Sequence, residues 1–210
     1  MLRIFFSSTL LASALPVVLS ACLVAADEDM NPDHNADLNH TPPSSTPAPH
    51  ADASVTVGQR QSTTLPFDQV LKKQDADFVR CASSAGAFEI ESSEWVLDHG
   101  RTGEPAVFAR TMIADHTKVA QKLDTLLTRK GLDGPDGMTG SDRKALDTLE
   151  KTPENQLGKA YVDAQVAAHQ TAVKLFADEA DNGKDADLRA FAAANLDMLK
   201  SHLAHAQAVQ

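Results

Sequence analysis

One stretch, residues 107–127 (VFARTMIADHTKVAQKLDTLL), constrains the fold more than any other part of the chain. Apolar side chains recur in it at alternating steps of three and four, which is the period of one buried face of an α-helix. His116 occupies a position on that face, between Met112 and Val119. The pattern therefore predicts a helix that carries a histidine toward the core of a helical domain.

Two later stretches place a histidine on a helix face in the same way. Between residues 162 and 180 the steps of three and four pass through His169. Between residues 188 and 206 an apolar stripe has His202 on its border. Three predicted helices thus each offer one histidine near the core.

A further helix is expected from Asp75 to about His99, with Asp75 or Asp77 as its N-cap, and its seam includes Glu89. Glycines at 100 and 103 predict a short turn, which makes this helix the antiparallel neighbour of the next. At 1.5 Å per residue, Glu89 then faces the level of His116 to within about 3 Å. The carboxylate and the imidazole are expected to meet.

The connection after the second helix is long. That helix is expected to begin at Pro105 and to end near Lys130, and residues 131–152 then combine a glycine-rich passage with a short helix capped by Ser141. A connection of roughly 20 residues can travel the length of a 25-residue helix, about 35 to 40 Å. The second and third long helices are therefore expected to run parallel.

The last two helices form a second hairpin. The third is expected from residue 152 to just before Asn182, and the fourth from about Asp185 to the C-terminus. This hairpin brings His169 within about one helical turn of His202. The predicted fold class is all-α: a four-helix bundle with a long connection and a short extra helix between helices 2 and 3.

The N-terminus has the form of a bacterial export signal. In residues 1–22 a single Arg3 precedes an apolar run that is too short for a membrane span and ends in the sequence LSAC. Leucine three places before Cys22 resembles the lipoprotein box, so we expect Cys22 to be lipidated, with plain secretion as the alternative. Because Leu23 follows in place of aspartate, analogy with lipoproteins indicates an outer-membrane anchor facing the periplasm, the alternative being a soluble periplasmic or secreted protein.

Residues 23–70 are rich in Pro, Asp, His and Ser and are expected to be a disordered tether, which leaves residues 71–210 as one domain. The tether histidines are assigned no role. Acidic residues outnumber basic ones by 29 to 19, which argues against a nucleic-acid partner because phosphate binding needs clustered Lys and Arg. No nucleophile motif or glycine-rich phosphate loop is present in the sequence, so enzymatic activity is not expected.

The segments FVRCASSAGAFEIESSEWVLDHG, VFARTMIADHTKVAQKL, YVDAQVAAHQTAVKLFADEADNGKDADLRAFAAANL and LKSHLAHAQ together resemble the bacterial family called domain of unknown function 4142. The resemblance covers about residues 75–210. It implies a ferritin-like four-helix bundle that is exported, of the outer membrane or periplasm, without an established activity. It places the polar marks of the family on Glu89 and Glu91, Asp115 and His116, His169 and His202. The chain departs from the family pattern at Cys81 and Ala168.

Two interpretations of the polar seam residues remain open. In one, Glu89, His116, His169 and His202 bind Zn, Cu or Fe, with Glu91 or Asp115 orienting a ligand. A di-iron oxidase is not expected, because such bundles use Glu-x-x-His on two helices and none of the four helices has it.

In the other interpretation, which the sequence favours, the same side chains form a buried polar network that fixes helix register. The domain is then a non-enzymatic structural or interaction module, anchored to a membrane by its lipid and presenting helix surfaces to a protein partner of the cell envelope.

Overall fold

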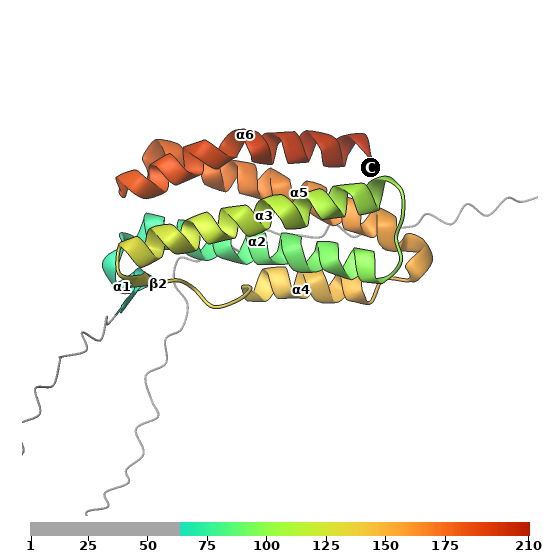
Figure 1. Cartoon of the computed structure of the whole chain (residues 1–210), viewed down its shortest axis with the longest axis horizontal. Coiled ribbons are helices and arrows are strands. Elements are labelled where there is room, and N and C mark those ends of the chain that lie inside the picture. Colours follow the sequence, from blue (N-terminus) through green and yellow to red (C-terminus); the bar gives the residue numbers. More distant parts are fainter. Residues whose placement is uncertain (1–63) are drawn as a thin grey trace, which may run out of the picture.

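The computed structural model describes residues 64–210, and four long helices packed side by side make up most of this part (Figure 1). The expected export signal, Cys22 and most of the expected tether lie outside the described residues. The all-α architecture is as predicted. The bounds of the long helices differ from the expected ones by about two residues, which is a usual uncertainty for helix ends. The helices are α2 (Lys73–Asp98), α3 (Glu104–Arg129), α5 (Glu154–Asn182) and α6 (Ala186–Ala208).

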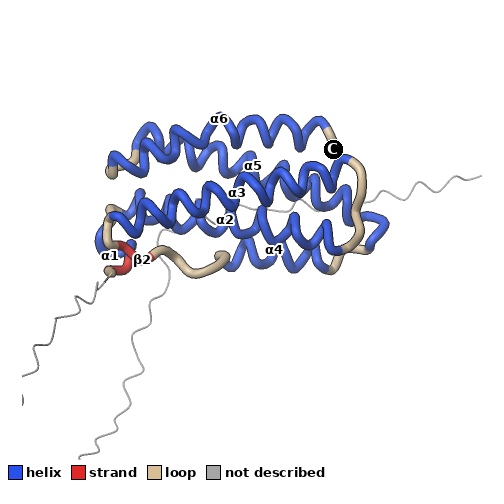
Figure 2. Tube along the Cα trace, viewed as in Figure 1, coloured by secondary structure: helices blue, strands red, loops and turns tan. Residues whose placement is uncertain are grey.

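The long helices run in the order that the connection lengths predict. Helices α2 and α3 form an antiparallel hairpin, as do α5 and α6, whereas α3 and α5 run in the same direction (Figures 1 and 2). The chain covers the distance back along the bundle with a loop and the short helix α4 (Gly140–Glu150). The expected cap, Ser141, does not cap this helix. The N-cap position belongs to Thr139.

Helix α4 is fixed to α2 by buried polar contacts. The backbone N–H of Thr139 donates to Ser84 Oγ at 2.7 Å, and Ser84 Oγ in turn donates to the carboxylate of Asp142. Burial raises the pKa of Asp142, and the hydroxyls of Ser84 and Thr139 act against this rise. A side chain on α2 thus holds the start of α4, which closes the bundle along one side.

The folded domain begins before residue 71, where the sequence placed its boundary. Residues Leu65–Pro66 form a short strand, β1, that pairs in parallel with β2 (Leu132–Asp133), and helix α1 (Phe67–Val70) follows it. Phe67 is buried and packs into the apolar core. Residues 65–70 therefore belong to the domain and not to the tether, because one aromatic side chain supplies the apolar contact that the rest of the segment lacks.

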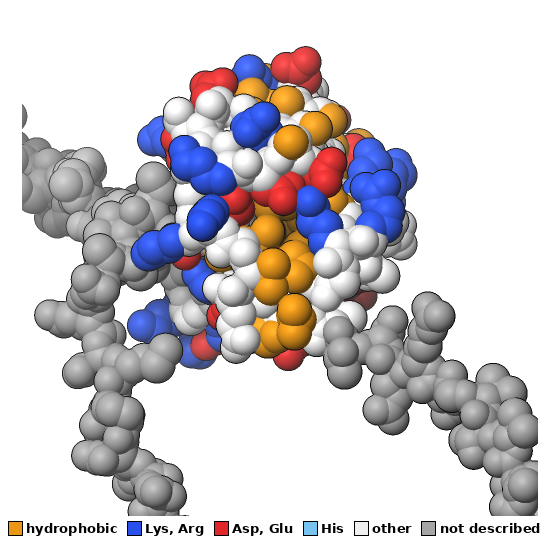
Figure 3. All heavy atoms as spheres, turned by 90° about the vertical axis from the view of Figure 1, so that its left-hand side faces the viewer, with side chains coloured by type: hydrophobic (Ala, Val, Ile, Leu, Met, Phe, Trp, Pro, Cys, Tyr) orange, Lys and Arg blue, Asp and Glu red, His pale blue; other side chains and the backbone are white. Residues whose placement is uncertain are grey.

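Apolar side chains gather in the middle of the end face that carries these elements, between rows of Lys and Arg (Figure 3). Leu65 and Val70, from β1 and α1 at this end, are among the large hydrophobic side chains that stay exposed. None of the described helices is both long enough and apolar enough to cross a membrane.

The core has three apolar parts, and a polar layer lies between the two larger ones. One part is built around the ring of Phe78, whose centroid lies 5.1 Å from that of Phe176 in an edge-to-face contact. The other part surrounds Phe108 and Tyr161. In sequence, and so in height along each helix, the seam residues Glu89 and His116 fall between the two parts. The bundle thus buries polar side chains at the level between its two larger apolar parts.

The start of α2 corrects one expectation. Asp75 is not an N-cap, because α2 begins at Lys73 and Asp75 is buried. Its carboxylate instead accepts the backbone N–H groups of Lys184 at 2.6 Å and Asp185 at 3.1 Å, in the turn between α5 and α6. Asp185, near which the last helix was expected to begin, caps α6, and its side chain accepts from the N–H groups of residues 187 and 188. One buried aspartate therefore ties the beginning of the first long helix to the turn before the last one.

Candidate metal centre

The expected meeting of Glu89 and His116 takes place. His116 Nδ1 lies 2.7 Å from Glu89 Oε2, and both side chains are buried between α2 and α3. Because a carboxylate oxygen only accepts, Nδ1 carries the proton of this contact. The other ring nitrogen of His116, Nε2, is left without a partner among the described residues.

His169 and His202 are held in the same manner. His169 Nδ1 lies 2.9 Å from the carbonyl oxygen of Gln165, one turn earlier on α5, and therefore donates to it. His202 Nε2 lies 3.2 Å from Asp115 Oδ2 and donates across from α6 to α3. Within the described part of the chain, His169 Nε2 and His202 Nδ1 have no hydrogen-bond partner.

The three imidazole rings form a nearly regular triangle. Their centroids are 5.5 Å apart for His116 and His169, 5.4 Å for His116 and His202, and 5.4 Å for His169 and His202. One ring nitrogen of each histidine lies within 4.8 Å of those of the other two. Nitrogens bound to one tetrahedral ion at about 2.0 to 2.1 Å stand about 3.3 Å apart. Small rotations of the rings therefore suffice to close the three nitrogens on an ion.

The pKa shifts follow from burial and from the neighbours of each group. Burial acts to raise the pKa of Glu89, but the surrounding imidazoles outweigh it and hold this pKa below its usual value. Burial acts to lower the pKa of His116, and contact with Glu89 raises it above the usual value. Each of these two groups therefore favours the charged form of the other.

The other two histidines stay neutral near pH 7. Burial is the main cause that lowers the pKa of His169, and burial together with the other imidazoles lowers the pKa of His202 to about 4 despite its contact with Asp115. A neutral imidazole that donates through one nitrogen presents a lone pair at the other. His169 and His202 thus offer lone pairs in a buried space with no described donor to satisfy them, which is costly unless a cation binds there.

The structure divides the residues that the sequence singled out into three groups. His116, His169 and His202 converge. Glu89 and Asp115 hold His116 and His202 by the nitrogen that faces away from a prospective ion, which is how carboxylates orient metal-binding histidines. Glu91 lies on the surface beside Arg143 and does not take part in the cluster.

A supporting layer of polar residues was not predicted from the sequence. Gln165 Nε2 donates to Ser92 Oγ at 2.9 Å, and Ser93 Oγ lies 2.7 Å from Tyr161 Oη, all of them buried. The signal was present in the spacing, because Gln165 stands one turn before His169 and the serines follow Glu89 by three and four residues. Helical spacing gives the shared face, but only the packing of α2 on α5 shows which polar atoms meet.

With this geometry in view, the chain can be placed among known proteins. The family model described as "Domain of unknown function (DUF4142)" matches residues 60–209, and the chain belongs to this family. The chain is also similar in fold to a structure described as "Crystal structure of DUF305 fragment from Deinococcus radiodurans". The TM-score is 0.58 at 13% sequence identity, over 66% of this chain and 96% of that one. No curated protein matches the chain.

Proposed function

We propose that this domain is a metal-binding module that holds one divalent transition ion with His116, His169 and His202. Two observations carry the proposal. In each ring one nitrogen is fixed by an acceptor and the other is buried without a partner among the described residues, and one ring nitrogen of each histidine lies within 4.8 Å of those of the other two. Metal-binding histidines have this arrangement because the outer hydrogen bond sets the tautomer and the ring orientation.

The donor set indicates which ions fit. Imidazole nitrogens suit Zn²⁺, Cu²⁺ and Fe²⁺ better than Mg²⁺ or Ca²⁺, which prefer oxygen. Three protein ligands leave a tetrahedral ion with one position for water or another small molecule. A structural zinc site is usually closed by four protein ligands, so this centre has the form of a site that exchanges a ligand.

This proposal reverses the order of the two interpretations that the sequence left open. A polar network that only fixed helix register would pair its buried polar atoms with one another. Here Glu89, Gln165 and Asp115 each accept from one nitrogen of an imidazole, and the other nitrogen of each ring is buried without a hydrogen-bond partner among the described residues. Every observation that fits the interaction-module interpretation is also explained by the metal site.

Metal content of the mature protein tests the proposal. We expect one equivalent of Zn²⁺ or Cu²⁺ per chain after loading and dialysis, and a rise in Tm that grows with free ion concentration because the ion binds only the folded chain. His169→Gln should lose the bound ion, while His205→Gln, on the exposed side of α6, should retain it.

The experiment also has clear contrary outcomes. Equal ion binding by the wild type and His169→Gln would overturn the assignment, as would a wild-type Tm that does not respond to either ion. Far-UV circular dichroism of both variants shows whether the loss of metal comes from the ligand or from unfolding.

We further propose that the protein acts in the cell envelope, anchored by a lipid on Cys22 and facing the periplasm. The support is the LSAC sequence after an apolar run. Cys81, the other cysteine of the chain, is buried and is not a free thiol. The intact mass of membrane-extracted protein tests the anchor: diacylglyceryl mass supports it, and its absence refutes it.

A further inference from the structure

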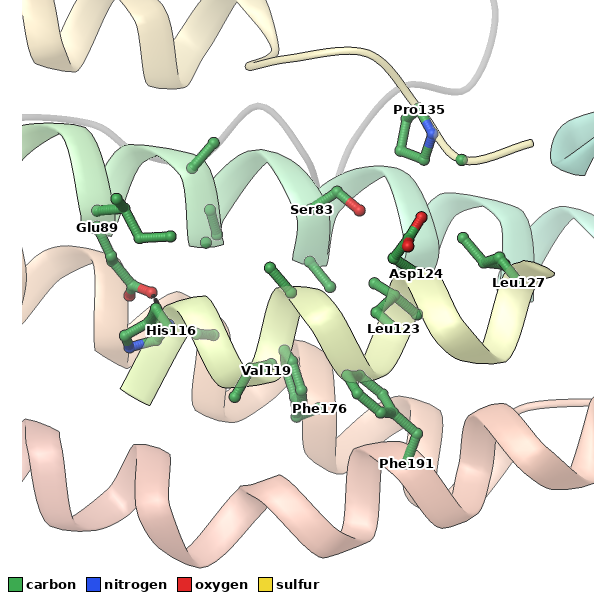
Figure 4. Close-up of a pocket in the computed structure, with 18 of the residues that line it drawn as sticks. Ser83, Glu89, His116, Val119, Leu123, Asp124, Leu127, Pro135, Phe176 and Phe191 are labelled. Atoms are coloured by element: carbon green, nitrogen blue, oxygen red, sulfur yellow. Dashed lines mark ion pairs between the residues drawn. The ribbon is translucent and has the colours of Figure 1, made fainter. Parts of the chain in front are cut away.

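An apolar pocket of about 300 Å³ lies beside the histidine cluster. Val119, Leu123 and Phe176 line its length, and Glu89 and His116 stand at one end (Figure 4). Pro135, from the loop between β2 and α4, also borders the pocket, on the side of α2 and α3 opposite Phe176 (Figure 4). The pocket is within the size range of small-molecule sites, which combine apolar walls with a few polar groups.

The glycine at position 86 is not required by the packing around α2. It lies inside α2, where glycine weakens a helix by about 1 kcal/mol relative to alanine. Among the described residues, a Cβ at this position would meet no atom within 4 Å, so no close neighbour demands glycine there. Gly86 lines the pocket with other small residues such as Ala82 and Ala120. Side chains too small to fill the space therefore keep it open.

One carboxylate oxygen at the polar end of the pocket is not hydrogen-bonded. His116 donates to Glu89 Oε2, whereas Glu89 Oε1 lies 3.5 Å from His169 Nδ1, whose proton is directed to Gln165, and has no hydrogen-bond partner among the described residues. A buried carboxylate oxygen is satisfied by an N–H or O–H group. A neutral hydroxyl suits this place because its hydrogen can donate to Glu89 while its oxygen retains lone pairs for a nearby ion.

We propose that the pocket binds an unbranched aliphatic alcohol, with its chain along Val119, Leu123 and Phe176 and its hydroxyl group at Glu89. The chain replaces the contacts that Gly86 and the alanines leave unmade, and the hydroxyl supplies the missing donor. Where a metal ion is bound as proposed above, the alcohol oxygen takes the open coordination position of that ion. This coordination rests on the proposed function, whereas the binding of the alcohol in the pocket does not.

Calorimetric titration with octan-1-ol tests the inference on the metal-free and the Zn²⁺-loaded protein. We expect saturable 1:1 binding in both forms, with tighter binding in the loaded form. Gly86→Leu fills the pocket and should weaken binding at least tenfold, whereas Gly86→Ala should retain it. In the metal-free protein octanoate should bind at least tenfold more weakly than octan-1-ol, because its carboxylate brings no donor to Glu89.

The inference is overturned by absence of saturable binding to the wild type, by unchanged affinity in Gly86→Leu, or by equal affinity for octanoate and octan-1-ol in the metal-free protein. Failure of the metal proposal is seen separately. In that case Zn²⁺ does not bind, while octan-1-ol still binds the metal-free wild type and distinguishes it from Gly86→Leu.

Discussion

The bundle buries two clusters of ionisable side chains, and they solve the problem of burial differently. In the middle, His116, His169 and His202 each keep one nitrogen in a hydrogen bond and leave the other free. At the α5–α6 turn, Asp75 gives both of its oxygens to backbone N–H groups, and Glu179 lies buried nearby. The first cluster retains nitrogens that can bind a ligand, whereas in the second the Asp75 carboxylate is fully used in fixing the α5–α6 turn.

Glu179 shows why unpartnered atoms alone do not make a site. Neither carboxylate oxygen accepts an N–H group among the described residues, and burial together with the neighbouring Asp75 carboxylate raises the pKa of Glu179 to about 8. A proton therefore neutralises this carboxyl near pH 7. The imidazoles of His169 and His202 instead have lowered pKa values, so protons do not satisfy their free nitrogens and a metal ion can.

The largest effect is expected where a cluster is purely structural. Asp75→Ala leaves two backbone N–H groups in the α5–α6 turn without their acceptor and should lower the free energy of unfolding by about 3 kcal/mol. Asp77→Ala removes only surface ion pairs from the same helix and should cost less than about 1 kcal/mol. Urea unfolding compares them, and similar losses for the two variants would show that Asp75 does not hold the turn.

The same cluster depends on the absence of a side chain at residue 183. A Cβ on Gly183 would lie 2.5 Å from Glu179 Oε1 and 2.6 Å from the carbonyl oxygen of the same residue. Gly183→Ala should therefore destabilise the domain by about 2 to 3 kcal/mol. Gly86→Ala, where space is open, should instead stabilise it by up to about 1 kcal/mol. Thermal melts that move in the same direction for both variants would contradict the difference.

The carboxyl cluster should also give the protein an alkaline sensitivity. The pKa of Glu179 is near 4.5 in the unfolded chain and about 8 in the folded one, so between these values the folded state holds a proton that the unfolded state has lost. The contribution of Glu179 to stability is then full below pH 4.5 and disappears as the pH rises through 8. Because solvent near the turn screens the charge, the loss in the free energy of unfolding over this pH range is about 2 kcal/mol.

Glu179→Gln tests this origin, because the amide is neutral at every pH. Urea unfolding at pH 5 and pH 8.5 should show a smaller loss of stability for Glu179→Gln than for the wild type. Asp181→Asn, an exposed position on the same helix, should keep the wild-type slope. An unchanged slope in Glu179→Gln would assign the pH dependence to other groups.

The smallest effect is expected from a residue that only orients a ligand. Asp115→Asn weakens the hold on His202 Nε2 and should reduce Zn²⁺ affinity about 10-fold, since such outer partners typically contribute 10- to 100-fold. Glu91→Gln, which alters a surface pair with Arg143, should leave the affinity unchanged. Competition with a chelator measures both. Equal affinities for wild type and Asp115→Asn would remove Asp115 from the centre.

Much of this arrangement could be predicted from the sequence, and the misses have a physical pattern. The steps of three and four around His116 and His169 gave the buried faces, and hairpin lengths gave the levels of Glu89 and His202. Asp75 was misassigned because an aspartate near a helix start usually caps that helix. Its true partners lie more than a hundred residues away in the chain, where local spacing carries no information.

The sequence by itself determined the four helices, the parallel course of the second and third, and the four polar positions that point inward, because helical period and connection length are local properties. Only the tertiary structure decided the role of each polar atom. It placed Glu89 and Asp115 behind His116 and His202, put Glu91 on the surface, and left three imidazole nitrogens close together. Such roles depend on which nitrogen of a ring meets which partner across the bundle, and that is fixed by packing between helices.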